Sequence, residues 1–237
     1  MDEARASRRV PKAPSRVLPR VAAALCAALL AGGTARAQIP PEPPSPIPFP
    51  RFEIALLAGY QLNSSLTWNE VTPYTSVGID NSPTWGVTGG YEFGPSLEGE
   101  IQYSYTKPKA TAFARNPEIP SPTFEIGIHQ FQFVGVTNFA PPGASVRPYF
   151  GLGVGFTVLN GSPTLENAVQ PAFSVLLGVK AYFGKTFGLR LEFRYAPAFL
   201  YTTGDGTEFC FDVNNCWNTG DRYLHQIDFR GGATFRF

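Results

Sequence analysis

The chain has 237 residues with 19 Lys and Arg against 18 Asp and Glu, so its formal net charge is +1 at pH 7. This balance argues against nucleic acid as a partner, because a nucleic-acid-binding surface needs an excess of positive charge. The 24 glycines, 20 phenylalanines and 10 tyrosines, with few segments of helical period, favour an all-β protein with many turns.

The first 37 residues have the layout of a secretory signal peptide. A basic region over residues 5–20 is followed by the apolar run Val21–Gly33 and by the small-x-small cleavage site Ala35-Arg36-Ala37. The apolar run is too short to span a bilayer as a helix. We therefore expect residues 1–37 to be removed on export, with a retained amino-terminal anchor as the alternative.

Residues 38–50, QIPPEPPSPIPFP, are dense in proline. Proline-rich segments adopt an extended, polyproline-like backbone that does not pack into a core. We expect a periplasmic tail here, and one folded domain over residues 51–237.

Eight segments of this domain alternate in steps of two between apolar or aromatic residues and small, polar or charged residues. A period of two predicts β-strands, because successive side chains point to opposite faces. The eight segments are 52–62, 84–93, 97–106, 124–139, 147–159, 173–183, 187–196 and 222–237. In segment 124–139 the apolar parity switches near Gln130, which either a β-bulge or large side chains on the inner face would explain.

The connections between these segments alternate in length. Residues 94–96, 140–144 and 184–186 form short turns, whereas residues 63–83, 107–123, 160–168 and 202–221 are long and polar. Short turns at one rim and long loops at the other are typical of outer-membrane barrels. The pattern predicts an all-β fold, an eight-stranded antiparallel up-and-down transmembrane β-barrel, and a soluble sandwich is the alternative.

The face opposite the aromatic residues carries seven acidic and six basic side chains. Charges removed from bulk water need partners, and a barrel of eight strands has room inside for little more than side chains. We therefore predict a lumen plugged by salt bridges rather than an open pore. The predicted network consists of Glu53, Glu92, Glu98, Glu100, Glu125, Arg147, Lys180, Arg190, Glu192, Arg194, Asp228, Arg230 and Arg236.

Cys210 and Cys216 lie six positions apart in the last long connection. In an exported protein a close pair of cysteines predicts a disulfide. A metal pair is the weaker interpretation, because no histidine stands at ligand spacing beside them, and we expect neither a metal nor a cofactor.

The sequence resembles the small outer-membrane barrels of the OmpA and OmpX type over residues 51–237. The resemblance is carried by Arg147-Pro148-Tyr149-x-Gly151-x-Gly153-x-Gly155, by the strand 188–195, and by the carboxyl end. That end matches the family's assembly signal at Arg230, Gly232, Phe235 and Phe237. The resemblance implies a location in the outer membrane, contact with membrane lipid, and recognition by the barrel-assembly machinery. The given sequence departs from full-length OmpA-type proteins by ending at the last segment, and we therefore do not expect wall anchoring through a peptidoglycan-binding domain.

Three functions are open at this point. The first is a structural or surface-interaction protein, expected to be a monomer, with outer loops available for binding. The second is a small pore or a carrier of hydrophobic solutes with a lateral exit. The third, a lipid A-modifying enzyme, needs a nucleophile with a histidine base and an orienting acid. His129 and His225 have no serine at the expected spacing, and we therefore do not expect an enzyme.

Overall fold

The computed structural model describes residues 51–67, 74–160, 168–200, 208–210, 216–218 and 223–237. All of them belong to one compact unit, Ile47–Phe237. The predicted signal peptide and proline-rich tail lie outside the described residues. No helix in the described part of the chain is long and apolar enough to cross a membrane.

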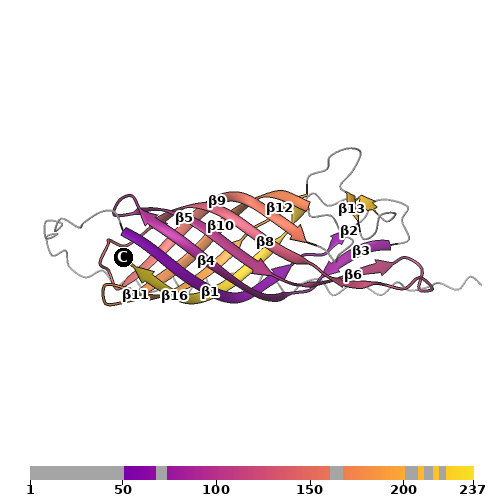
Figure 1. Ribbon diagram of the computed structural model, residues 1–237, viewed down its shortest axis with the longest axis horizontal. Coiled ribbons are helices and arrows are strands. Elements are labelled where there is room, and N and C mark those ends of the chain that lie inside the picture. Colours follow the sequence, from indigo (N-terminus) through magenta and orange to yellow (C-terminus); the bar gives the residue numbers. More distant parts are fainter. Residues whose placement is uncertain (1–50, 68–73, 161–167, 201–207, 211–215, 219–222) are drawn as a thin grey trace, which may run out of the picture. The chain divides into compact units, whose positions relative to one another are not determined.

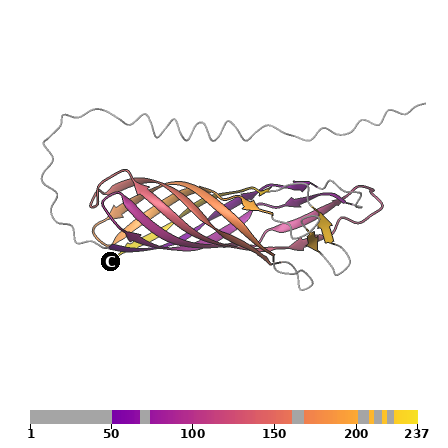
Figure 2. The same cartoon turned by 90° about the horizontal axis from the view of Figure 1, so that it is seen from above.

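Eight long strands form a closed antiparallel barrel, which confirms the predicted fold (Figure 1 and Figure 2). Each strand pairs with the next barrel strand along the chain, and the last pairs with the first. The strands are β1 (Arg51–Asn63), β4 (Ser82–Glu92), β5 (Leu97–Thr106), β8 (Gly127–Asn138), β9 (Val146–Asn160), β10 (Ala168–Phe183), β11 (Phe187–Tyr195) and β16 (Gln226–Arg236).

The outer wall of the barrel is apolar and the inner wall is polar. Along β4, for example, buried residues alternate with exposed ones, and only the last outward residue, Tyr91, is half-buried. Large apolar side chains lie exposed around the wall, including Leu56, Ile101, Phe133 and Leu191 at 57%, 60%, 60% and 62%. A soluble sheet would bury such residues, so this wall is built to face hydrocarbon.

Short turns close one rim of the barrel. Gly143 and Gly184 have φ values of 92° and 89°, a left-handed conformation that glycine adopts without steric cost. The carboxyl terminus lies at this same rim, at the left of Figure 1. Because short turns face the periplasm in outer-membrane barrels, we call this the inner rim and the opposite one the outer rim.

Two of the long connections contain β-strands, which the sequence-based prediction did not include. They contribute β2 (Leu66–Thr67), β3 (Tyr74–Ile79), β6 (Lys109–Ala114) and β7 (Thr123–Glu125). These strands form a four-stranded antiparallel sheet in the order β2-β3-β6-β7, which we call the outer sheet. Figure 1 shows β2, β3 and β6 beyond the outer rim.

Four short strands complete the outer rim. β12 (Ala198–Phe199) and β15 (Tyr223–Leu224) pair with each other and extend the barrel sheet, since β12 also pairs with β10. β13 (Glu208–Cys210) and β14 (Cys216–Asn218) form a separate two-stranded sheet.

Of the two explanations for the parity switch near Gln130, the bulge was wrong and the inward side chains are confirmed. β8 pairs in continuous register with β5 and with β9 through this position. The parity changes because Val134 and Val136 point into the lumen, where they pack against Tyr149 and Leu176. Gly151 of β9 makes room for them, since a Cβ atom there would lie 1.9 Å from Leu176 Cδ1.

An apolar cluster joins the outer sheet to the outer end of the barrel. Buried residues of the outer sheet pack there against buried residues at the outer-rim ends of the barrel strands. Its members are Leu66, Val77, Ile79, Ala110, Ala112, Ile126, Ile128, Leu159, Ala172, Ala198, Leu200 and Leu224, with Tyr74 and Phe124 packed against them.

Candidate functional site

The structure brings twelve of the thirteen predicted lumen charges together inside the barrel. All twelve are at most 6% exposed. They comprise six acids and six bases: Glu53, Glu92, Glu98, Glu100, Glu192 and Asp228 with Arg147, Lys180, Arg190, Arg194, Arg230 and Arg236.

Glu125 is the exception, and its assignment to the lumen network was wrong. It lies exposed in β7 of the outer sheet, where its Oε2 is 2.5 Å from Lys107 Nζ. The hydrogen bond and positive charge of Lys107 lower the pKa of Glu125, and the reverse interaction raises the pKa of Lys107. The prediction failed because residues 123–125 leave the barrel, so their parity no longer separates lumen from lipid. Without Glu125 the described lumen charges cancel, six against six.

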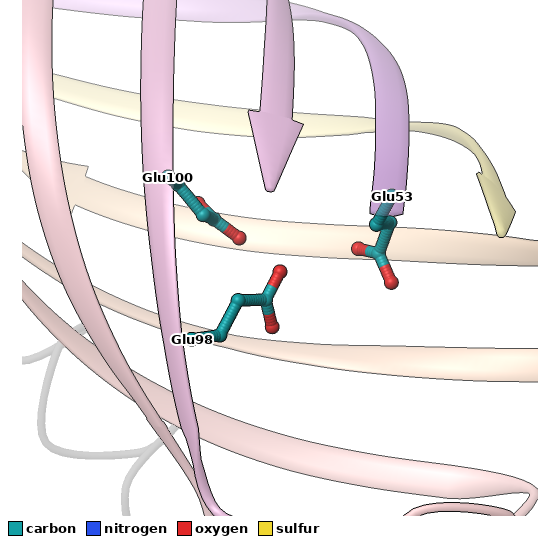
Figure 3. A group of neighbouring side chains, drawn as sticks. All are labelled: Glu53, Glu98 and Glu100. Carbon is teal, nitrogen blue, oxygen red and sulfur yellow. The ribbon is translucent and has the colours of Figure 1, made fainter. Parts of the chain in front are cut away.

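Lys180 of β10 lies at the centre of three carboxylates. Its Nζ is 2.7 Å from Glu53 Oε1, 2.8 Å from Glu98 Oε2 and 3.3 Å from Glu100 Oε1. The three carboxylates point toward one another (Figure 3), with one oxygen of each within 4.8 Å of the others. Three converging carboxylates could ligate a hard cation. In this protein the Lys180 ammonium supplies that positive charge.

Arg190 of β11 links two further acids. Its Nη1 and Nη2 donate to Glu100 Oε1 and Oε2 at 2.6 and 2.9 Å. Nη2 also donates to Glu192 Oε2 at 2.5 Å. Tyr149 accepts from Arg190 Nε at 2.8 Å and donates to Glu192 at 2.8 Å. Paired donors in this geometry match a carboxylate and fix the guanidinium in place.

Further ion pairs occupy the inner end of the lumen. Arg147 Nη1 lies 2.5 Å from Glu92 Oε1, and Arg236 contacts the same carboxylate oxygen. Tyr182 donates to Glu53 Oε2 at 2.5 Å, and the Arg236 guanidinium lies 4.0 Å from the centre of the Tyr182 ring.

Toward the outer end the charges give way to neutral polar groups. Arg194 Nε donates to Asp228 Oδ2 at 2.7 Å and its Nη2 donates to Ser104 at 2.8 Å. Gln130 also accepts a hydrogen bond from Arg194 and donates one to Gln226. Beyond this layer lies the apolar cluster described above.

The sequence reasoning omitted several members of this network. Tyr149, Tyr182, Gln102 and Gln130 lie on the inward parity and hydrogen-bond the charges, but only charged residues were counted. Counting every polar residue on the inward parity would have found them.

Both histidines lie on the outer wall near the outer rim, each beside a tyrosine. His129 Nδ1 is 2.9 Å from the Tyr103 hydroxyl, and His225 Nδ1 is 2.7 Å from the Tyr195 hydroxyl. Each tyrosine hydroxyl thus forms a hydrogen bond with a histidine ring. The absence of enzymatic activity remains a prediction.

The predicted disulfide and assembly signal have defined backbone positions. The register of β13 and β14 places Cys210 opposite Cys216, while their side chains lie outside the described residues, so the disulfide stays a prediction.

In the carboxyl-terminal segment, Arg230 points into the lumen and contacts Glu192. Phe235 and Phe237 face outward at 36% and 71% exposure. A Cβ atom at Gly232 would lie 1.8 Å from Leu56 O of the neighbouring strand.

The barrel geometry agrees with the protein family that the sequence matches. The model of a family described as outer membrane protein beta-barrel domain matches residues 24–237. No curated protein matches the sequence.

Several solved structures share the fold. Neisserial surface protein A aligns with a TM-score of 0.51 and 14% identity, covering 79% of this chain and 97% of that one. OprG from Pseudomonas aeruginosa aligns with a TM-score of 0.57 and 12% identity, covering 79% and 95%. The outer membrane protein AlkL, solved in lipid bilayers, aligns with a TM-score of 0.50 and 14% identity, covering 85% and 97%. At these identities the likeness concerns the fold.

Proposed function

The chain belongs to the family of outer membrane protein β-barrel domains, and from this premise we propose that it is a closed barrel of structural or surface-interaction type. In this proposal the lumen does not conduct, and the outer sheet with its neighbouring loops contacts other molecules. Its place in the outer membrane follows from the family and the fold.

The observation that carries the proposal is the six-against-six balance of buried charge in the lumen. A buried ion costs several kcal/mol unless it is paired and hydrogen-bonded. Some of the partners come from strands that are not neighbours in the wall, as when Lys180 of β10 reaches Glu98 of β5. Side chains that span the lumen in this way occupy the space that a water-filled pore would need.

The outer sheet supports the second half of the proposal. It has its own buried residues, among them Val77, Ile79, Ala110 and Ala112 at 0–8% exposure. A packed sheet holds its exposed face in a fixed arrangement, and residues presented by a rigid scaffold are those that commonly bind partners. We also propose that the protein is monomeric and is not an enzyme. Mass spectra of lipid A with and without the protein test the latter, and an altered acyl chain would contradict it.

A second candidate is a carrier of hydrophobic solutes with a lateral exit, and one observation favours it. Between β11 and β12, Ala196 and Pro197 keep backbone hydrogen bonds to both neighbouring strands, from Ala196 N–H to Gln226 O and from Phe173 N–H to Pro197 O. Pro197 has no N–H of its own to donate. This proline position lies beside Ala172, Ala198 and Leu224 of the apolar cluster. A hydrophobic solute would thus have apolar contacts close to a point of the wall where one backbone donor is missing.

Two measurements separate the candidates. Planar-bilayer recordings of the refolded protein test whether the lumen is closed. Uptake of a fluorescent hydrophobic probe into proteoliposomes tests the carrier, with Ala198→Trp as the variant that fills the apolar region beside Pro197. Uptake that exceeds empty liposomes and falls in Ala198→Trp would favour the carrier over the structural proposal.

A further inference from the structure

One continuous strip of outward side chains runs from the lipid-facing wall onto the outer sheet. Exposed or half-buried residues alternate with buried ones without a break from residue 97 to residue 113, through β5, the connection at Pro108 and β6. The strip consists of Ile101, Tyr103, Tyr105, Lys107, Lys109, Thr111 and Phe113. Its chemistry changes in order from apolar to aromatic, then to cationic, and then to hydroxyl and aromatic.

The length of β5 places these zones relative to the membrane. A tilted transmembrane strand needs roughly nine to eleven residues to cross the hydrocarbon. β5 has 10 residues and ends at Thr106. Lys107 is therefore the first residue of the strip beyond the hydrocarbon, and Lys109, Thr111 and Phe113 lie progressively farther out.

Below the lysines the wall carries an interfacial group of aromatic rings. Trp85 lies 5.8 Å and His129 4.6 Å from Tyr105, measured between ring centres. Tyr103 contacts Phe131 at 4.9 Å. Aromatic rings with polar tips concentrate where hydrocarbon meets headgroups, and this group marks that level on β4, β5 and β8.

At the headgroup level, the positive charge that the structure describes gathers in this strip and directly after it. Among the residues that the structure describes, the exposed cations beyond the outer rim are Lys107, Lys109 and Arg115, all from one segment. Their acidic neighbours are Glu125, which pairs with Lys107 and lies opposite Lys109 in the strand register, Asp80, whose backbone N–H donates to Lys109 O, and Glu118, three residues after Arg115. Lys109 has no ion pair within 4.0 Å among the described residues.

Above the lysines the strip offers hydroxyl groups and an aromatic platform. The Thr111 and Thr123 hydroxyls lie 2.9 Å apart on neighbouring strands. The Phe113 ring is 48% exposed and covers Gly78, where a Cβ atom would lie 2.9 Å from the ring. A ring held on a glycine presents its free face to solvent, and it can stack on an apolar face of a ligand while hydroxyls beside it form hydrogen bonds.

We propose that this strip binds a phosphorylated glycolipid of the outer leaflet. The acyl chains contact the wall at Ile101, the phosphate contacts Lys107 and Lys109, and the sugar contacts Thr111 and Phe113. The order of chemical groups along the strip matches the order along such a lipid, and the surface continues the lipid-facing wall. A cation near an anionic lipid surface contributes to affinity in proportion to the number of charges.

The test measures bound lipid on the full mature protein by native mass spectrometry, after exchange into nanodiscs that contain diphosphorylated lipid A. The main variants are Lys109→Gln, which leaves the Lys107–Glu125 pair intact, and the double variant Lys107→Gln/Lys109→Gln. Lys185→Gln is the matched control, because Lys185 is an exposed lysine at the inner rim. Heat-modifiable gel migration verifies that each variant has folded.

We expect the double variant to bind diphosphorylated lipid A about tenfold more weakly than the wild type, and Lys185→Gln to bind as the wild type does. Dephosphorylated lipid A should bind the wild type about as weakly as the intact lipid binds the double variant. Equal binding by all variants, or an equal loss in Lys185→Gln, would overturn the proposal. Displacement of the lipid by millimolar inorganic phosphate would also overturn it, since the site would then recognise the free anion.

Discussion

Arg190 and Glu100 face each other across the lumen and share two parallel hydrogen bonds, at 2.6 and 2.9 Å. Both side chains are fully buried. Because β11 carries the arginine and β5 the glutamate, the pair connects strands that are not neighbours in the barrel wall. The pair therefore holds opposite sides of the barrel together as well as balancing charge.

Replacement of Arg190 by methionine should destabilise the barrel strongly. The change leaves Glu100 and Glu192 without their shared cation, and breaking a buried pair costs about 3–5 kcal/mol in free energy of unfolding. Urea unfolding in detergent micelles measures this loss. The double variant Arg190→Met/Glu100→Gln should lose less than the sum of the single variants, because it removes one unpaired charge. Strict additivity would show that the two side chains are not coupled.

Lys180→Met should convert the three-carboxylate cage into a cation site. Without the ammonium, Glu53, Glu98 and Glu100 repel one another, and their oxygens suit Ca²⁺ or Mg²⁺. We expect the variant to melt at a lower temperature in EDTA and to regain stability when Ca²⁺ is added. The wild type and Arg147→Met, which disturbs a different part of the plug, should show no such gain. A gain of equal size in all three proteins would count against the cage.

The amphipathic period predicted the eight barrel strands because each strand borders lipid on one side and packed polar side chains on the other. The same period misassigned Glu125, because parity indicates the lumen only where the strand is part of the barrel wall. It also left the parity of Val134 and Val136 ambiguous, because apolar residues can occupy the lumen where Gly151 leaves space.

The outer sheet was harder to predict for another reason. Its strands are short, from two to six residues, and lie within polar segments that read as loops. Their burial depends on contacts between residues far apart in sequence, such as Val77 with Ala112. The ion-pair partners of Lys180 could not be predicted either. They are far from Lys180 in the sequence, and only the register of the closed barrel brings the inward side chains together.

Gly232→Ala should impair folding even without cellular machinery. The added Cβ would lie 1.8 Å from a backbone oxygen, Leu56 O, and a backbone atom of the neighbouring strand cannot move aside easily. Overpacking of this kind costs about 1–3 kcal/mol. Refolding yield into detergent micelles measures it, and Gly135→Ala is the control because its nearest neighbour would be 3.9 Å away.

Phe237→Ala separates this steric role from recognition by the barrel-assembly machinery. The backbone hydrogen bond from Phe237 N–H to Phe52 O remains in this variant. We expect normal refolding in vitro but reduced outer-membrane levels in cells. Phe139→Ala, which removes an equally exposed ring from the inner rim, should leave both unchanged. Normal cellular levels of Phe237→Ala would contradict the assembly role of this residue.

The Lys107–Glu125 pair should make the outer sheet sensitive to acid. Lys107 lowers the pKa of Glu125 in the folded protein, so the pair contributes stability above the ordinary carboxyl pKa and loses it as the pH falls through the lowered pKa. The protection of the β7 amides against hydrogen exchange, taken relative to the intrinsic exchange rate at each pH, should therefore fall at acidic pH. In Lys107→Gln the pKa of Glu125, followed by NMR, should return toward its ordinary value. An unchanged pKa would show that the pair does not persist in solution.

Single-channel recording in planar bilayers tests the closed lumen most directly. Refolded wild-type protein should show no steady ohmic conductance, because the paired side chains of Lys180, Arg190 and their acids fill the cross-section. A variant that truncates several of these side chains at once, such as Lys180→Ala/Arg190→Ala/Glu100→Ala, should conduct if it retains heat-modifiable migration. Reproducible ohmic conductance of the wild type at the level of that variant would contradict the plugged barrel.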